Sequence, residues 1–192
     1  FILGLTGSIG MGKSTTAGLF KKRGIPVYDA DLTVHDLYRG RLVPEIEKAF
    51  PGSTTEQGVD RTRLGALVIG KPDQMQRLES IVHPAVQAEQ DQFVARHFAE
   101  PIIVLDIPLL FENKKDQFCD AVVVVSTDPV TQRKRVLARP DMTVEKLDAL
   151  LARQIPDEDK RRRAQFIIDT GHDIAHADRQ VASLLKALSG RM

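Results

Sequence analysis

The sequence has a single cysteine, no long apolar run and almost no net charge, and each shortage excludes a class of protein. Cys119 cannot form an internal disulfide, which indicates a reducing compartment, and we expect it to be a small buried apolar residue. Every apolar run falls short of the roughly 20 residues that a membrane span requires. The formal net charge of +1 gives no indication of nucleic-acid binding. We therefore expect a cytoplasmic protein that binds neither membranes nor nucleic acids.

The chain length of 192 residues suits one domain with a full hydrophobic core. The sequence has no internal repeat, low-complexity tract or flexible linker that would divide it. Its apolar start, residues 1–5, runs directly into a glycine-rich loop without a basic leader or a cleavage site. We therefore expect a strand there rather than a signal peptide, with a starting methionine before Phe1.

The glycine-rich loop, residues 7–14, reads GSIGMGKS and matches the pattern G-x-x-x-x-G-K-[ST] at every specified position. It lies between an apolar strand-like run and a helix-like stretch, residues 13–23, which is the context of a phosphate-binding P-loop. Glycines allow consecutive backbone N–H groups to approach phosphate oxygens, and Lys13 adds a positive charge for the β- and γ-phosphates. The Ser14 hydroxyl can reach a Mg²⁺ ion. The loop therefore predicts a nucleoside triphosphate site rather than a chance glycine-rich turn.

Three carboxylates follow the apolar runs that we predict as the next strands. Asp29 and Asp31 come after residues 25–28, and Asp106 ends the run at 102–106. In open α/β sheets the carboxyl ends of strands face the ligand, so these side chains are expected near the phosphates. Asp106 is expected to hold the hydration shell of Mg²⁺. Either Asp29 or Asp31 could instead cap the helix that follows.

Residues 32–100 have little strand character and several helical patterns, at 42–50, 63–69 and 73–98. Pro84 is expected to break or kink the last of these helices at His83. An insertion of roughly seventy residues is much longer than an ordinary α/β connection, and it could form a substrate wall. His83 taken alone would more often be structural than functional.

The C-terminal half predicts two more strands, at 121–125 and 166–169, and a closing helix at 174–188. Between the strands, two arginine-bearing helices are joined by a short turn at 139–142. Segment 139–155 could be a lid that closes over phosphates, or an exposed basic hairpin.

From end to end, the sequence resembles the dephospho-CoA kinase family. The resemblance rests on residues 5–15, Asp29-Ala30-Asp31, His83-Pro84, residues 106–112 (DIPLLFE), Gln154 and residues 166–169. It implies a three-layer α/β kinase core with a five-stranded parallel sheet, a helical insertion on the CoA side and a lid. It also implies transfer of the γ-phosphoryl of ATP to the ribose 3′-hydroxyl of dephospho-CoA, with Mg²⁺ as cofactor. We expect a monomer or a weak oligomer.

Residue roles follow from the P-loop and from this resemblance. Asp31 is expected to accept the proton of the ribose hydroxyl, and Arg139, either alone or together with Arg153, to neutralise the transferring group. The expected ATP-binding residues are Gly7, Gly10, Met11, Gly12, Lys13, Ser14, Thr15, Arg139 and Gly171. The expected acceptor-binding residues are Asp31, His83, Pro84, Leu109, Leu110, Phe111, Glu112 and Arg153. Ser14 and Asp106 are the expected Mg²⁺ residues, and Lys13 is counted with Asp31 and Arg139 as catalytic.

Two other functions compete with this interpretation. Asn113-Lys114-Lys115-Asp116 matches the guanine-reading pattern N-K-x-D of GTPases, but it begins only seven residues after Asp106. No glycine has an aspartate three residues before it, so the D-x-x-G switch motif is absent, and we expect 113–116 to be a solvated turn. A kinase of another small acceptor, such as a nucleoside monophosphate, is excluded only by the family resemblance.

Overall fold

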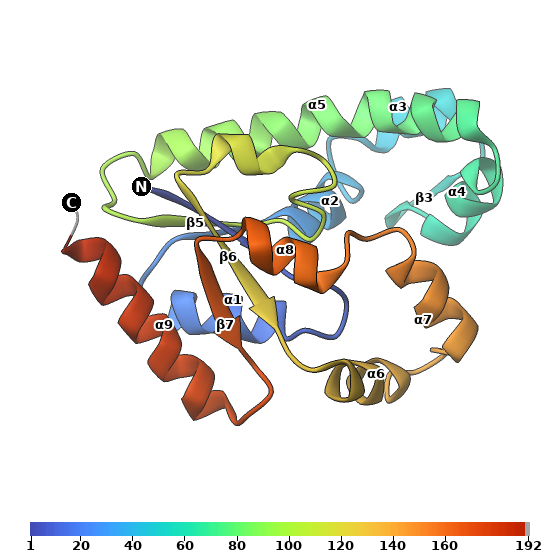
Figure 1. Cartoon of the computed structure of the whole chain (residues 1–192). Coiled ribbons are helices and arrows are strands. Elements are labelled where there is room, and N and C mark those ends of the chain that lie inside the picture. Colours follow the sequence, from blue (N-terminus) through green and yellow to red (C-terminus); the bar gives the residue numbers. More distant parts are fainter. Residues whose placement is uncertain (191–192) are drawn as a thin grey trace. The chain divides into compact units, whose positions relative to one another are not determined.

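The computed structural model describes residues 1–190 and shows an α/β protein (Figure 1). The strands are β1 (Ile2–Thr6), β2 (Val27–Asp29), β3 (Thr54–Thr55), β4 (Gly58–Val59), β5 (Ile103–Asp106), β6 (Ala121–Ser126) and β7 (Phe166–Asp169). The α-helices are α1 (Lys13–Lys22), α2 (Ala30–Leu37), α3 (Val43–Ala49), α4 (Arg61–Val68), α5 (Pro72–Arg96), α6 (Pro129–Leu137), α7 (Val144–Leu151), α8 (Asp157–Arg163) and α9 (Ile174–Ser189). A 3₁₀-helix, η1, spans Lys115–Phe118.

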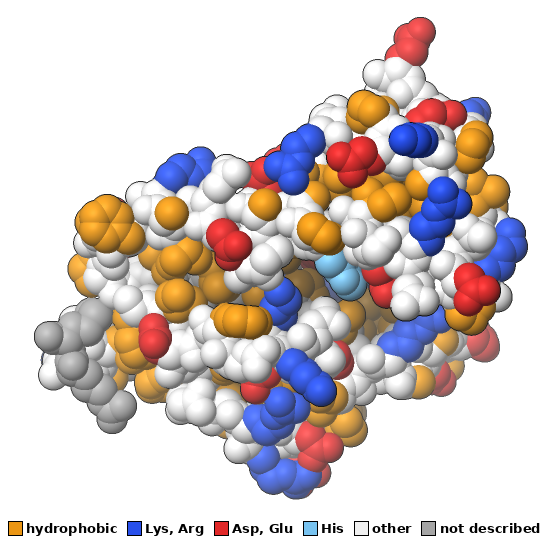
Figure 2. Space-filling view, turned by 90° about the horizontal axis from the view of Figure 1, so that it is seen from above, with side chains coloured by type: hydrophobic (Ala, Val, Ile, Leu, Met, Phe, Trp, Pro, Cys, Tyr) orange, Lys and Arg blue, Asp and Glu red, His pale blue; other side chains and the backbone are white. Residues whose placement is uncertain are grey.

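The chain divides into two compact units, each with its own hydrophobic core. The first, which we call the nucleotide unit, consists of Phe1–Tyr28 and the chain from His97 onward. The second, the inserted unit, is the continuous segment Asp29–Arg96. Over residues 1–190, every helix is too short or too polar to cross a lipid bilayer. Lys and Arg side chains are interspersed with Asp and Glu on the face seen in Figure 2.

The sheet of the nucleotide unit has the strand order β2-β5-β1-β6-β7, and its strands run parallel. The register places Leu3 opposite Val104 on one side and Ala121 on the other. At the far end of the sheet, Ser126 is paired with Asp169. The predicted five-stranded parallel sheet is therefore confirmed, and the strands end along one edge, where a ligand site is expected.

Helices cover one face of this sheet and a long loop covers part of the other. On one face α1 and α9 pack on the strands, with Phe20 and Val181 completely buried. On the other face Leu110 and Cys119 lie over Gly4, where an added Cβ would be 2.9 Å from the Cys119 sulfur. Since both faces are covered, every residue of β6 is buried, which explains its run of valines.

A buried ion pair fixes α8 to the segment that follows β5. Lys160 is completely buried, and its Nζ lies 2.9 Å from Oε1 of Glu112. The backbone N–H of Ile155 also donates to Oε1, at 2.9 Å. Burial by itself would raise the pKa of Glu112, but the contacts with Lys160 and with backbone N–H groups outweigh it and lower that pKa. Glu112 is therefore held as a carboxylate in the folded protein.

Replacing Glu112 by glutamine is expected to lower the free energy of unfolding by about 3–5 kcal/mol, because it leaves the buried Lys160 charge unpaired. The matched control is Glu158→Gln, in which an 81% exposed carboxylate loses its pairing with Arg162 and should cost less than about 1 kcal/mol. Chemical denaturation at pH 7, followed by circular dichroism, measures both variants. Equal, small losses would mean that the buried pair adds nothing to stability.

The same pair predicts a pH dependence. Because folding lowers the pKa of Glu112, its carboxylate stabilises the protein above the pKa of an unfolded glutamate. This contribution is lost as the pH falls through the lowered pKa of the folded state. The difference in the free energy of unfolding between the parent protein and Glu112→Gln should therefore be constant near neutral pH. It should decrease as the pH falls below the pKa of an ordinary glutamate.

The inserted unit is mainly helical, as predicted, but it departs from the prediction at Pro84. Helix α5 continues through Pro84 over 25 residues, so a break at His83 is wrong, whereas the alternative, a kink there, stays a prediction. Proline removes one helical hydrogen bond and crowds the preceding turn, at a cost of about 3 kcal/mol. Val82 and Ala85, on either side of it, are buried in the core of this unit. Burial of this helix face offsets the local cost of the proline.

A two-stranded antiparallel hairpin, β3–β4, was not predicted in the inserted unit. Its two-residue strands are too short to produce a recognisable alternation of apolar and polar residues. Gly58 adopts a φ of +115°, and an added Cβ would come within 2.4 Å of the Tyr38 carbonyl oxygen. This close approach lets the N–H of Val59 donate to the same oxygen at 2.8 Å.

Candidate functional site

The P-loop of the nucleotide unit connects β1 to α1 and requires glycine at two positions. Gly10 and Gly12 have φ angles of +80° and +89°, which side-chain-bearing residues rarely adopt. Gly12 is the N-cap of α1, so the free N–H groups of the first helical turn follow it directly. Backbone N–H groups at a helix start, together with the helix dipole, form an anion-binding site.

Lys13 and Asp106 meet beneath this loop. Lys13 Nζ lies 2.6 Å from Asp106 Oδ1, and their side chains are only 14% and 3% exposed. Asp106 is the last residue of β5, and Lys13 is the first of α1. Ser14 and Thr15 follow in the first turn of α1 and are exposed. The structure thus brings together the lysine and the carboxylate that the sequence predicted for phosphate and metal binding.

Side chains from three other segments hold the P-loop backbone in place. Gln132 Nε2 donates to the carbonyl of Ile9 at 2.8 Å, and Gln154 Oε1 accepts from the N–H of the same residue at 3.3 Å. Thr170 Oγ1 donates to the carbonyl of Met11 at 2.7 Å. The loop conformation is therefore supported by residues up to 159 positions away in the sequence.

Arg135 connects α6 to the loop after β7. Its Nη2 donates to the carbonyl oxygen of Thr170 at 2.6 Å, and its Nη1 donates to the hydroxyl at 3.2 Å. Gly171, which was predicted to contact ATP, comes next and is exposed. A Cβ added to Gly171 would lie 3.2 Å from Thr127 Oγ1. One network thus links Gly171, through Thr170, to both the P-loop and α6.

A cavity of about 570 Å³ opens beside Met11, at the carboxyl ends of β6 and β7. Its volume is within the usual range for small-ligand pockets. Four carboxylates and one guanidinium are among the residues that line it: Asp128, Asp157, Glu158, Asp169 and Arg161. Such a lining repels phosphate groups but tolerates an uncharged ring with hydrogen-bond donors.

The predicted lid segment, residues 139–155, follows α6 and contains one helix, α7. Arg139 follows α6, Arg153 follows α7, and both side chains are exposed. The two helices are joined by an ion pair of 3.3 Å between Arg133 and Asp148. Within residues 1–190, neither Arg139 nor Arg153 forms an ion pair or a side-chain hydrogen bond. Both guanidinium groups are therefore available to a ligand.

The segment predicted to contact the acceptor, Leu109–Glu112, is mostly buried. Leu109 is half-buried, whereas Leu110 and Phe111 are 0% and 3% exposed. The Phe111 ring lies under the guanidinium of Arg163, 4.3 Å from it, and Glu112 is paired with Lys160. These side chains contribute to the core of the nucleotide unit, and their contact with a substrate stays a prediction.

The inserted unit carries the other predicted acceptor residues. Asp29 caps α2, since its Oδ1 accepts from the N–H of Leu32 at 2.9 Å. Asp31, in the first turn of α2, is exposed, as are His83 and Pro84 on α5. Of the two aspartates, Asp29 therefore serves as the N-cap of α2, whereas the carboxylate of Asp31 is accessible.

Comparison with known proteins identifies the family. A family model described as dephospho-CoA kinase matches residues 1–176. The chain is 54% identical over 188 residues to a dephospho-CoA kinase of Rhodopseudomonas palustris (strain HaA2), covering 97% of this chain and 94% of that protein. It is 53% identical over 190 residues to that of Novosphingobium aromaticivorans, covering 98% and 94%. The chain belongs to the dephospho-CoA kinase family.

Members of the dephospho-CoA kinase family are ATP-dependent kinases, and this chain catalyses the last step of coenzyme A biosynthesis. Its fold is similar to that of a dephospho-CoA kinase from Campylobacter jejuni, with a TM-score of 0.69, 26% identity and coverage of 97% and 96% of the two chains. It is also similar to TT1252 from Thermus thermophilus, with a TM-score of 0.86, 31% identity and coverage of 98% and 97%.

As a dephospho-CoA kinase, the chain has no need of the N-K-x-D pattern at 113–116, and the structure gives these residues other contacts. Lys114 adopts a φ of +53° just before η1, and Asp116 forms an ion pair of 3.2 Å with Arg163. The carboxylate that would read a guanine ring is thus already paired. Asn113 and Lys114 are exposed, which agrees with the predicted solvated turn.

Proposed function

We propose that the chain performs dephospho-CoA phosphorylation with the P-loop as the triphosphate cradle and Lys13 as the cation on the β- and γ-phosphates. The observation that carries this proposal is the 2.6 Å pair of Lys13 and Asp106 at the carboxyl end of β5. A lysine next to the free N–H groups at the start of α1 suits a triphosphate, because both carry positive charge or partial positive charge. The phosphate oxygens can also pair with Lys13 in place of Asp106.

The residues around this pair fit Mg²⁺. The Asp106 carboxylate and the Ser14 hydroxyl are hard oxygen donors, and Mg²⁺ in ATP sites is typically bound through one or two carboxylates together with substrate phosphates. When bound, the ion supplies charge neutralisation for the triphosphate. Asp106 and Ser14 would hold it, while Lys13 contacts the phosphates.

The adenosine portion of ATP is assigned to the surroundings of Gly171. The cavity beside Met11 has room for an uncharged ring, and its carboxylates suit the donor groups of an adenine better than a further phosphate. Gly10, Gly12 and Thr15 are assigned to the phosphates together with Gly7 and Ser14. Arg139 is assigned to the transferring γ-phosphoryl.

Dephospho-CoA, the phosphoryl acceptor, is assigned to Asp31 and to the other acceptor-binding residues that the sequence predicted. Asp31 would hydrogen-bond the ribose 3′-hydroxyl and accept its proton as the oxygen attacks phosphorus. His83, Pro84, the Leu109–Glu112 segment and Arg153 would contact the rest of dephospho-CoA. We further propose that the protein works in the cytoplasm as a monomer or weak oligomer, with small molecules as its partners.

The proposal is tested with purified protein, Mg-ATP or Mg-GTP, and a panel of acceptors that includes dephospho-CoA and several nucleoside monophosphates. ADP release should require dephospho-CoA and should be faster with ATP than with GTP. Lys13→Met should abolish it, whereas Lys71→Met, at an exposed position before α5, should not. Comparable turnover of a nucleoside monophosphate would favour the competing kinase function.

A further inference from the structure

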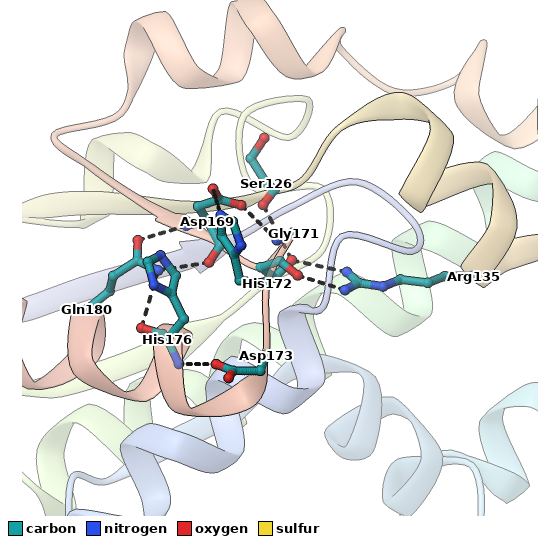
Figure 3. Close-up of polar contacts among 9 residues, drawn as sticks. Ser126, Arg135, Asp169, Gly171, His172, Asp173, His176 and Gln180 are labelled. Atoms are coloured by element: carbon teal, nitrogen blue, oxygen red, sulfur yellow. Dashed lines mark hydrogen bonds and ion pairs between the residues drawn. The ribbon is translucent and has the colours of Figure 1, made fainter.

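A carboxylate and two imidazoles lie together where β7 ends and α9 begins (Figure 3). Asp169, His172 and His176 each offer one ligand atom, and these three atoms lie within 4.8 Å of one another. Asp169 Oδ2 is 3.8 Å from His172 Nε2. The centroids of the two imidazole rings are 4.7 Å apart. Asp169 also lines the cavity beside Met11, whereas neither histidine has a role in the sequence-derived site.

The local sequence explains why these side chains converge. Asp169 is the last residue of β7, and three residues separate it from Asp173, the N-cap of α9. The Asp173 side chain accepts from the N–H of His176 at 2.7 Å, which fixes the first turn of the helix. His172 lies just before this N-cap and His176 lies in the first turn of α9, so both imidazoles are at the start of the helix.

Hydrogen bonds fix the backbone that carries the cluster. Gln180 exchanges two bonds with Asp169, since its Nε2 donates to the carbonyl at 2.8 Å and its Oε1 accepts from the N–H at 2.9 Å. Gly171 N–H donates to Asp169 Oδ1 at 2.7 Å. Arg135 Nη2 donates to the carbonyl oxygen of the intervening Thr170 at 2.6 Å. Bonds of this kind around a metal ligand orient it and contribute to affinity.

We propose that Asp169, His172 and His176 bind a divalent transition-metal ion of the Zn²⁺ class. Two imidazoles and one carboxylate form a donor set that suits Zn²⁺, Ni²⁺ or Cu²⁺, whereas Mg²⁺ prefers oxygen ligands alone. Three protein ligands leave at least one position open to water or to another molecule. This site shares no residue with the Mg²⁺ site assigned to Ser14 and Asp106.

The three ligand atoms need to move only a short way toward one another to bind an ion. With bonds of about 2.0–2.1 Å in tetrahedral geometry, ligand atoms lie about 3.4 Å apart. The 3.8 Å between Asp169 and His172 is close to this value. The side chains of these two residues are 52% and 65% exposed, so they can rotate without displacing the core. Asp169 can keep its Oδ1 bond to Gly171 while Oδ2 turns to the ion.

The test uses the full chain without an affinity tag and without nucleotide, titrated with Zn²⁺ by calorimetry in excess Mg²⁺. The parent protein should bind one equivalent that Mg²⁺ does not displace. Zn²⁺ affinity should fall at least about tenfold in each of three variants, His172→Gln, His176→Gln and Asp169→Asn. Even the loss of a hydrogen-bond partner of a metal ligand typically lowers metal affinity by about 10–100-fold. Asparagine keeps the acceptor for Gly171, and it replaces the Oδ2 that would bind the ion by an amide nitrogen, which does not.

Two controls separate this site from other histidines and from the thiol. His35→Gln, in the inserted unit, should leave Zn²⁺ binding unchanged. Burial, followed by nearby Asp116 and Asp120, raises the pKa of Cys119 to about 11, so this thiol should stay protonated, and Co²⁺ should give an absorption spectrum without thiolate bands. Equal Zn²⁺ affinity in the parent and in His172→Gln/His176→Gln, each folded by circular dichroism, would overturn the proposal. No binding by the parent would overturn it as well.

Discussion

Replacing Arg139 by alanine is expected to lower kcat by a factor of about 10³–10⁵ while changing ATP affinity far less. The guanidinium is exposed at the end of α6 and has no ion pair within residues 1–190, so it is available to the charge that develops during phosphoryl transfer. The P-loop, by contrast, supplies most of the expected contacts to bound ATP. Steady-state kinetics with dephospho-CoA, together with equilibrium ATP binding, measure the two effects separately.

Arg133→Ala is the matched control for Arg139→Ala. Arg133 lies on α6, six residues before Arg139, and is 46% exposed, but it is already paired with Asp148. Its loss should change kcat only a few-fold, because an exposed ion pair contributes little. Losses of similar size in kcat and in ATP affinity for Arg139→Ala would instead make Arg139 a binding residue with no special role in the transition state.

Replacing Asp31 by asparagine is expected to lower kcat by about 10²–10⁴-fold with near-normal binding of ATP and dephospho-CoA. A ribose hydroxyl is a poor nucleophile at neutral pH, and a carboxylate within hydrogen-bond reach can orient it and accept its proton. Asparagine keeps the size and hydrogen-bonding capacity of the side chain and removes its charge. Kinetics and equilibrium binding of both substrates to the same preparation measure the change.

Asp29→Asn provides the comparison for Asp31→Asn. Asp29 caps α2, and asparagine is as good an N-cap as aspartate, so this variant should fold normally and keep most of its activity. The assignment of the proton acceptor would be reversed by a folded but inactive Asp29→Asn together with an Asp31→Asn variant within a few-fold of the parent protein.

The sheet could be predicted from the sequence because its strands are buried on both faces. Residues 121–125 form a continuous apolar run, and the structure places them in β6, where every residue is buried. The P-loop and the helix after it could also be predicted, since the glycines, Lys13 and Ser14 have the spacing of the motif G-x-x-x-x-G-K-[ST]. These features are local, and so the sequence alone specifies them.

Contacts between distant residues could not be predicted in the same way. Lys160 stands beside Arg161–Arg163, and all four residues suggest a solvated face. The three arginines are exposed, but Lys160 is completely buried because Glu112, 48 residues earlier, provides the opposite charge. Likewise, nothing local to Thr170 indicates that its hydroxyl holds the P-loop carbonyl of Met11.

The division of the chain has a consequence for how such enzymes diversify. The inserted unit, Asp29–Arg96, is one uninterrupted segment with its own core, and it forms the connection between β2 and its neighbour β5. Because the P-loop, Lys13 and Asp106 all lie outside this segment, substitutions within it can accumulate without altering the triphosphate cradle. On the proposed assignment of Asp31 and His83 to the acceptor, changes in this segment would alter acceptor binding while the residues proposed for the phosphoryl donor stay the same.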